Sequence, residues 1–249
     1  MPPPSGQPRR CPTPCRRSHA VTLRARAEAP LRKAAFGGAG RDWRYVSPVR
    51  SATDLTLEAY QDCNDLYCAA SPSAVAVPVA ALLDALVDLI PPSGRVLEIG
   101  SGPGLEAQYL EQRGLVVDRT DATPAFVERL RREGHPARLL DVRKDDLGGP
   151  YDAVVANAVL LHLERAEAEK ALAACLAGTR PGGVLALTLK EGDGESWSET
   201  KLGRPRWFVY WREAPLRRVL ERVGWEVLDL RPVQGRTEGW LHALCRRQA

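Results

Sequence analysis

The chain has 249 residues, of which 44% are hydrophobic, 27% charged and 6% aromatic, which excludes collagen-like, disulfide-dense and wholly disordered proteins. No apolar run approaches the roughly 18–20 residues of a membrane span; the best stretch, residues 75–90, contains a proline and two aspartates. We therefore expect a soluble globular protein without membrane contact. The six cysteines, in a chain without a secretory leader, favour reduced thiols and a cytoplasmic location.

The net charge of +4 is unevenly distributed along the chain. Residues 1–50 contain eleven basic and two acidic residues, a net charge of +9, so the remainder carries −5. A body of that charge lacks the basic footprint that nucleic acid requires, and we expect no nucleic-acid partner. We expect a monomer or a homodimer that acts on a small molecule.

Residues 1–48 are rich in proline, arginine, alanine and glycine and have no apolar periodicity, which predicts a disordered basic tail. An organelle transit peptide, a disordered arm and untranslated sequence from a wrong start site all remain open for this segment. Cys11 and Cys15 lie close together, with His19 as the only further ligand nearby. These residues do not complete a tetrahedral zinc site, and we expect no metal.

From about residue 54 onward, short apolar runs alternate with helical patterns. Helices are predicted at 55–67, 75–90, 105–113, 124–133, 165–176 and 214–223, and strands at 95–99, 115–121, 137–141, 151–157, 183–190, 225–230 and 240–245. The alternation predicts an α/β fold, with a mostly parallel sheet covered by helices on both faces, and the last two strands form an antiparallel hairpin at one edge. We expect one domain over 49–249, with an N-terminal helical cap (54–90) and a lid segment (190–212).

Polar residues and glycines follow the predicted strands at the end where such sheets bind ligands. The first strand runs into Glu98-Ile-Gly100-Ser101-Gly102-Pro103-Gly104, and later strands end at Asp121, Asp141 and Asn157. Three glycines in five residues let the backbone turn sharply and admit a ligand close to it. Asp121, 21 residues after Gly100, is placed to accept hydrogen bonds from ribose hydroxyls, and Asp141 from an adenine amino group.

A nicotinamide enzyme is an alternative, because Gly102, Gly104 and Ala107 also fit a G-x-G-x-x-A pattern. Pro103 removes a backbone N–H from the turn that would hold the pyrophosphate, and Glu98 places a negative charge beside it. A ligand with a cationic amino group suits Glu98 better.

Taken in order, these motifs resemble those of the class I S-adenosylmethionine-dependent methyltransferases of small-molecule type. The resemblance covers about residues 54–246 and rests on the glycine turn, the strand-end residues, Tyr151 to Asn157 and Arg180-Pro-Gly-Gly-Val-Leu185. It implies a doubly wound seven-stranded sheet of order 3-2-1-4-5-7-6 with strand seven antiparallel. Charged residues at 118 and 119 depart from the family's usual buried strand and leave Asp118 open beside Asp121.

The resemblance also implies cofactor contacts for particular residues. Gly100, Ser101, Gly102 and Gly104 would line the methionine part, Glu98 would lie beneath them near its amino group, Asp121 and Ala122 would take the ribose, Asp141 and Val142 the adenine, and Asn157 the sulfonium end. Tyr60 or Tyr67, from the helical cap, would close over the cofactor.

The expected reaction is an in-line displacement that moves a methyl group to an oxygen or nitrogen of a small molecule. His162 is the candidate general base, with a packing or capping role as its alternative. In the lid, Arg204, Arg206, Trp207 and Tyr210 are candidate substrate contacts, and each has packing or solvation as its alternative. Two other functions stay open: an RNA or protein methyltransferase helped by the basic tail, and a catalytically silent cofactor-binding protein.

Overall fold

The computed structural model describes residues 50–249, so the predicted tail, with Cys11, Cys15 and His19, lies outside the described residues. The helices are α1 (Ala52–Asp62), α2 (Asn64–Ala69), α3 (Val77–Val87), α4 (Leu105–Glu111), α5 (Pro124–Arg132), α6 (Arg165–Gly178) and α7 (Glu213–Val223), with a 3-10 turn η1 (Leu160–His162). The strands are β1 (Arg95–Ile99), β2 (Val116–Asp121), β3 (Ala137–Leu139), β4 (Tyr151–Asn157), β5 (Thr179–Lys190), β6 (Glu195–Ser198), β7 (Arg206–Val209), β8 (Trp225–Gln234) and β9 (Gly239–Arg247).

Seven strands form one sheet in the order β3-β2-β1-β4-β5-β9-β8. The first five pair in parallel, and β9 runs antiparallel to both of its neighbours. The predicted fold class and strand order are therefore confirmed, with β8 and β9 as the sixth and seventh strands of that order. The order reverses between β1 and β4, and such a switch point opens a crevice at the carboxyl ends of the strands.

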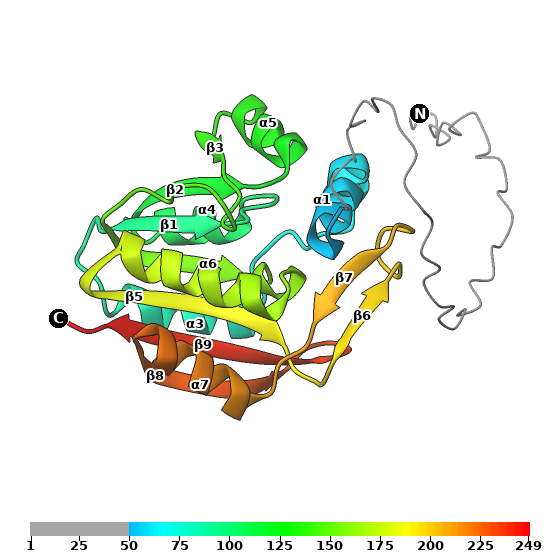
Figure 1. The fold of residues 1–249 in the computed structure, drawn as a ribbon. Coiled ribbons are helices and arrows are strands. Elements are labelled where there is room, and N and C mark those ends of the chain that lie inside the picture. The colour runs from blue at the N-terminus through cyan, green and yellow to red at the C-terminus, as the bar shows by residue number, and fades with distance from the viewer. Residues whose placement is uncertain (1–49) are drawn as a thin grey trace, which may run out of the picture. The chain divides into compact units, whose positions relative to one another are not determined.

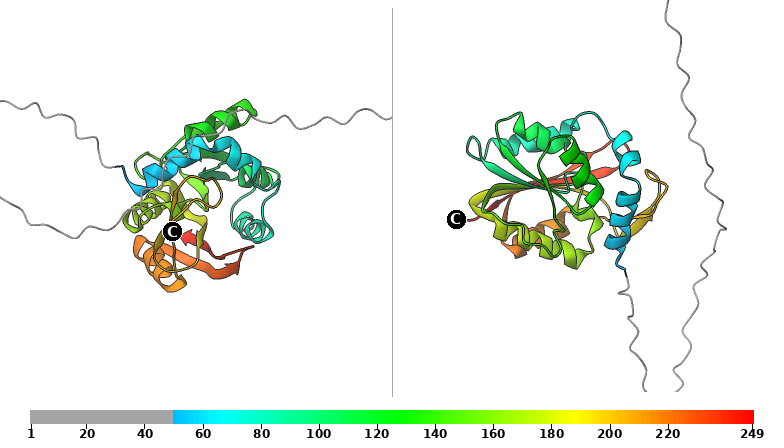
Figure 2. Two further views of the ribbon diagram at one scale, coloured as in Figure 1. Left: turned by 90° about the vertical axis from the view of Figure 1, so that its right-hand side faces the viewer. Right: turned by 90° about the horizontal axis from the view of Figure 1, so that it is seen from above.

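Helices cover both faces of this sheet (Figures 1 and 2). Val154 and Ala156 of β4 belong to one apolar core with α6 and α7, whereas Ala153 and Val155 belong to a second core with α3 and α4. Successive residues of a strand point to opposite faces, so a strand buried on both sides must be apolar throughout. Burial on both faces therefore explains the almost uninterrupted apolar run of β4.

The segment predicted as a lid contains two strands that the sequence analysis did not predict. β6 and β7 pair as a separate antiparallel sheet, with Trp197 opposite Trp207. Each strand has only four residues, too few for an alternating pattern to stand out from its charged surroundings. The helix predicted at 55–67 is likewise two helices, with Cys63 between them.

Helix α1 crosses the carboxyl ends of the central strands and packs beside β7 (Figure 1). Ser51 and Asp54 form a capping box that begins the helix. Thr56 Oγ1 accepts a hydrogen bond from the backbone N–H of Trp207 at 2.9 Å, and Thr53 Oγ1 lies 2.9 Å from the backbone oxygen of His162. These contacts fix the helix over the end of the sheet where a ligand would bind.

Within residues 50–249, no helix combines the length and apolarity needed to cross a membrane. The same residues contain no group of three or more histidine, cysteine, aspartate or glutamate side chains arranged to hold a metal ion.

We expect Thr56→Val to destabilise the protein by about 1–2 kcal/mol, because the valine keeps the shape but leaves the Trp207 N–H without its acceptor. Urea unfolding followed by circular dichroism measures the change. Thr237→Val, on an exposed position between β8 and β9, is the control and should change stability by less than about 0.5 kcal/mol. Equal stability of the two variants would contradict the anchoring role of Thr56.

Candidate active site

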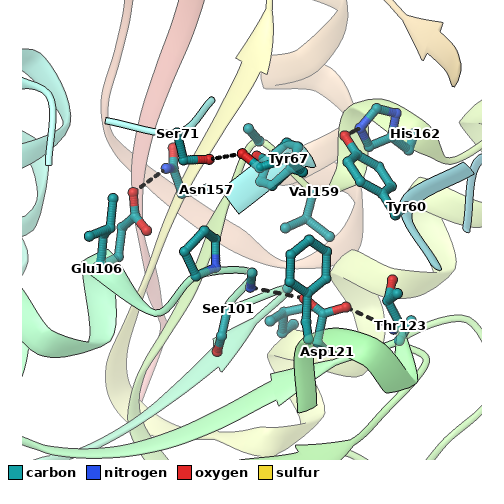
Figure 3. Close-up of a pocket in the computed structure, with 18 of the residues that line it drawn as sticks. Tyr60, Tyr67, Ser71, Ser101, Glu106, Asp121, Thr123, Asn157, Val159 and His162 are labelled. Carbon is teal, nitrogen blue, oxygen red and sulfur yellow. Dashed lines mark hydrogen bonds between the residues drawn. The ribbon is translucent and has the colours of Figure 1, made fainter. Parts of the chain in front are cut away.

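A cavity of about 280 Å³ opens at the carboxyl ends of β1, β2 and β4, beneath α1 and α2 (Figure 3). Of the predicted site residues, those that line it are Tyr60, Tyr67, Gly100, Ser101, Gly102, Asp121, Ala122, Asp141, Val142, Asn157 and His162. Residues from five segments far apart in the sequence therefore converge here. Glu98, Gly104 and the four lid residues do not belong to its wall.

Asp121 ends β2 at the bottom of the cavity (Figure 3). Its carboxylate accepts one hydrogen bond from the Gly102 N–H at 2.9 Å and another from the Thr123 N–H at 2.8 Å. Desolvation raises the pKa of Asp121, and the two backbone donors oppose that rise. Each carboxylate oxygen keeps a lone pair for a ligand, because an ionised carboxylate has about four acceptor sites.

The geometry distinguishes Asp121 from Asp118, which the sequence had left open. Asp118 accepts hydrogen bonds from Tyr151 and from Arg138, on the side of β2 away from the cavity. Arg119 is buried and reaches the carboxylate of Glu111 on α4 with two 2.6 Å bonds. The charged side chains inside this strand are thus paired, and Asp121 is the acidic residue that faces the cavity.

The glycine turn after β1 brings the backbone to the cavity wall. Gly100 has φ of +68°, and a Cβ there would lie 2.5 Å from the Val159 side chain. Gly102 has φ of +50°, and a Cβ there would meet no atom within 4 Å, so its backbone borders open space. Only glycine fits at position 100 without strain. At position 102, the missing side chain leaves room for a ligand next to the backbone.

Glu98 is buried beneath this turn, with 2% of its surface exposed. Its Oε2 has no hydrogen-bond partner within the described residues. Desolvation, with the nearby Glu106 charge, raises the pKa of Glu98 to about 8. A carboxyl group of this kind would be stabilised in its ionised form by a cation bound above the turn.

Asp141 lies at the cavity wall after β3, where Arg143 holds its carboxylate. Arg143 donates to both Asp141 oxygens and also to Asp54 on α1 at 2.8 Å. Desolvation alone would raise the pKa of Asp141, but the bonds from Arg143 lower it below its usual range. The arginine thus connects the predicted adenine site to the helix that covers the cavity.

Glu106 is a cavity residue that the sequence analysis did not identify. It lies in the first turn of α4 and accepts a 2.8 Å hydrogen bond from Asn157 Nδ2 (Figure 3). Asn157 Oδ1 accepts in turn from Thr188 Oγ1 at 2.6 Å, which fixes the amide. Desolvation raises the pKa of Glu106, while the bond from Asn157 opposes that rise. An acidic residue at the start of a helix resembles an ordinary partner of the helix dipole, so no sequence signal distinguished it.

Three aromatic rings, one each from α1, α2 and α5, line one side of the cavity. Tyr60 and Tyr67 meet edge to face at 5.3 Å between centroids, and Tyr67 and Phe126 at 5.5 Å. The two tyrosines had been predicted to close over a cofactor, and the structure brings both to the cavity. Phe126 was not identified because its helical spacing matches an ordinary core residue.

His162 is held by hydrogen bonds to both ring nitrogens. Nδ1 lies 2.6 Å from the backbone oxygen of Trp207, so it carries the proton, and Nε2 accepts from the Tyr60 hydroxyl at 2.9 Å. Desolvation lowers the pKa of His162 to about 3, and the positive charges of Arg206 and Lys190 act in the same direction. These contacts favour the packing role over that of a general base.

The four lid residues predicted to contact substrate have other partners in the structure. Arg204 pairs with Asp62 at the surface, and Tyr210 makes a 3.2 Å contact with Ser196. Arg206 is buried and donates to the Tyr60 hydroxyl, whereas Trp207 uses its backbone to hold α1 and His162. Their contact with a substrate stays a prediction.

The chain was compared with families and with known proteins. A family model described as a methyltransferase domain matches residues 73–230. The curated methyltransferase ucsB of an Acremonium species is 31% identical over 153 residues, which are 51% of this chain and 51% of that protein. The chain thus spans about half the length of this relative.

Solved structures of the same fold include a methyltransferase and a cyclase. The Burkholderia thailandensis 1,6-didemethyltoxoflavin-N1-methyltransferase, solved with 1,6-didemethyltoxoflavin and S-adenosylhomocysteine, superposes with a TM-score of 0.61 at 21% identity, over 82% of this chain and 94% of that one. The [4+2]-cyclase SpnF superposes with a TM-score of 0.60 at 18% identity, over 80% and 97%. At these identities the likeness shows the fold alone.

We expect Glu98→Gln to stabilise the protein at pH 8 by about 1–3 kcal/mol, with a gain that shrinks towards pH 5. Between pH 4.5 and 8 the unfolded chain loses the Glu98 proton while the folded chain keeps it, so this group lowers stability as the pH rises. Urea unfolding at pH 5, 6.5 and 8 measures the difference from the native chain. Glu226→Gln, exposed on β8, serves as control, and a gain independent of pH for Glu98→Gln would rule out the raised pKa.

Proposed function

The chain belongs to the methyltransferase-domain family, and from that membership we propose that it uses S-adenosylmethionine to methylate an oxygen or nitrogen atom of a small molecule. The observation that carries the proposal is the cavity at the switch point, where the glycine turn and Asp121 meet at hydrogen-bond distance. The bound S-adenosylhomocysteine of the Burkholderia enzyme, which shares the fold, supports the choice of cofactor.

The residues around the glycine turn fit an adenosyl sulfonium compound. Glu98, Glu106 and Asp121 lie at or beneath this wall, and Glu98 has an unpartnered buried oxygen. Acidic groups stabilise a ligand that carries an amino group and a sulfonium and destabilise a pyrophosphate. Pro103 lacks an N–H that a phosphate would need. The nicotinamide alternative therefore fits this wall less well.

In this proposal, Asp121 and Ala122 hold the ribose, Asp141 and Val142 hold the adenine, and the glycine turn with Asn157 holds the methionine part. When bound, S-adenosylmethionine supplies a methyl group that is already activated on a sulfonium. Tyr60, Tyr67 and Phe126 exclude water from the space next to it. Helix α1 and the β6–β7 hairpin serve as cap and lid.

Methyl transfer in this site relies on positioning of the acceptor rather than on proton removal by His162. Both ring nitrogens of His162 are engaged and its pKa lies near 3, so it binds a proton only in strong acid. Holding two reactants at near-attack distance accounts for a large part of a barrier by itself. Acceptors that need not lose a proton before the transfer, such as an unprotonated ring nitrogen, suit this arrangement.

A second candidate is a cofactor-binding protein without methyl transfer. Two observations favour it: the engaged state of His162, and the existence of a cyclase with the same fold. Incubation with labelled S-adenosylmethionine and a metabolite extract separates the two functions. A compound that gains a methyl mass supports the methyltransferase, whereas binding of S-adenosylhomocysteine without turnover supports the second candidate.

We further propose a cytoplasmic location and a monomeric or homodimeric state, without a nucleic-acid partner. The cysteines of the described region, at 63, 68, 175 and 245, are all free thiols, which supports a reducing compartment.

We expect deletion of residues 1–48 to leave methyl transfer to the small acceptor unchanged, because the cavity is built from residues 53–201. Transfer to bulk RNA or protein, measured with labelled cofactor at 50 and 200 mM salt, should stay at background with and without this segment. An RNA substrate lost on deletion in a salt-dependent way would instead identify a macromolecular methyltransferase.

We expect Asp121→Asn to weaken S-adenosylhomocysteine binding at least tenfold, because the amide offers one acceptor oxygen where the carboxylate offers two. Isothermal titration calorimetry measures the affinity, and circular dichroism checks folding. Asp118→Asn is the matched control on the same strand and should leave the affinity within about threefold, since Asp118 lies away from the cavity. Unchanged affinity in a folded Asp121→Asn protein would refute the proposed cofactor site.

A further inference from the structure

The β6–β7 hairpin and the residues before β7 bring two basic side chains to the aromatic side of the cavity. Lys201 lines the cavity, and its Nζ lies 3.8 Å from the centroid of the Tyr67 ring. Arg206 stands behind Tyr60, with its guanidinium carbon 5.6 Å from the ring centroid and its Nη1 donating to the hydroxyl at 3.1 Å. Both positive charges thus adjoin the rings that cover the cavity.

Neither charge has an acidic partner within residues 50–249. Arg206 is only 6% exposed, and its buried Nε has no hydrogen-bond partner in the described part of the chain. Lys190, another basic residue of this region, differs because it pairs with Glu238 at 2.8 Å. Lys201 is an exposed residue at the cavity wall, whereas Arg206 is buried. A buried cation without a counterion is costly, so a nearby anion would stabilise Arg206, and the same anion would be attracted to Lys201.

The acidic residues of the cavity are engaged elsewhere. Asp121 binds two backbone N–H groups, Asp141 binds Arg143, and Glu106 binds Asn157. These three acidic residues therefore have partners of their own, while Lys201 and Arg206 adjoin the aromatic rings without an acidic partner in the described residues. Desolvation lowers the pKa of Lys201, and the positive charge of Arg206 adds to that lowering.

We propose that the acceptor is a small flat compound that carries a carboxylate, and that Lys201 binds this carboxylate at the cavity while the rings of Tyr60, Tyr67 and Phe126 contact its apolar part. Arg206 adds a second positive charge from behind Tyr60. This inference rests on the proposed function, since it assigns the acceptor of the same site. It makes Lys201 a residue that determines specificity.

The test measures binding of matched acids and amides to the full-length protein saturated with S-adenosylhomocysteine. The probes are benzoate, 4-hydroxybenzoate and 2-naphthoate with their amides, titrated by calorimetry. We expect at least one acid to bind about tenfold more tightly than its amide, as for a hydrogen bond to a charged group. Lys201→Met should reduce this preference to less than about threefold, and Lys201→Arg should retain it.

Lys170→Met is the matched control, because Lys170 is exposed on α6, outside the cavity. It should keep the full preference for the acid. Amides that bind as tightly as acids, a preference that survives Lys201→Met, or no binding of any acid would each overturn the inference. Titration with S-adenosylhomocysteine alone comes first. Failure to bind this compound refutes the proposed function, whereas binding of this compound without a preference for acids refutes only the present inference.

Discussion

The cavity depends on one pair of hydrogen bonds, from the Gly102 and Thr123 N–H groups to the Asp121 carboxylate. One donor belongs to the turn after β1 and the other to the turn after β2, so the carboxylate connects the two loops that border the switch point. This connection requires the parallel register that places Ile99 opposite Thr120. A shift by one residue would turn Asp121 to the other face of the sheet. The position of the glycine turn, and of each residue that faces it, follows from that register.

Acidic groups lie near the glycine turn and two basic groups adjoin the aromatic rings, and these groups suit two kinds of ligand. Desolvation raises the pKa of Glu98 and of Glu106 near the glycine turn, and the charge of Glu106 adds to the rise at Glu98. Lys201 and Arg206 stand beside Tyr60 and Tyr67. In a site of low dielectric each group favours a ligand of opposite charge, so a cationic donor and an anionic acceptor would be held in one orientation only. Such an arrangement of charges would fix the orientation of the donor relative to the acceptor before the methyl group moves.

The sequence predicted what depends on local pattern, and missed what depends on long-range pairing. The strand-end residues were found because a buried strand, a turn and a polar residue are adjacent in sequence, as at Gly100 and Asp121. The segment 190–212 contains several arginines and lysines, and the sequence pattern does not distinguish which of them is nearest to a ligand. Which of them faces the cavity depends on the β6–β7 register, where Arg206 pairs with Ser198, and on the course of the chain before β7. Arg204 was named as a candidate and pairs with Asp62 in the structure, whereas Lys201, which lines the cavity, was not named as a site residue.

The contacts of His162 favour a packing role over that of a general base. To take a proton from an acceptor, Nε2 would have to release the Tyr60 hydroxyl, which also accepts a hydrogen bond from Arg206. The Trp207 carbonyl that receives the Nδ1 proton belongs to the residue whose N–H binds Thr56 of α1. One neutral chain of hydrogen bonds therefore joins the hairpin, the 3-10 turn and the covering helix. Desolvation of a charged imidazolium is the main reason for the low pKa of His162, and the positive charges of Arg206 and Lys190 lower it further. The histidine thus shapes the site by staying neutral.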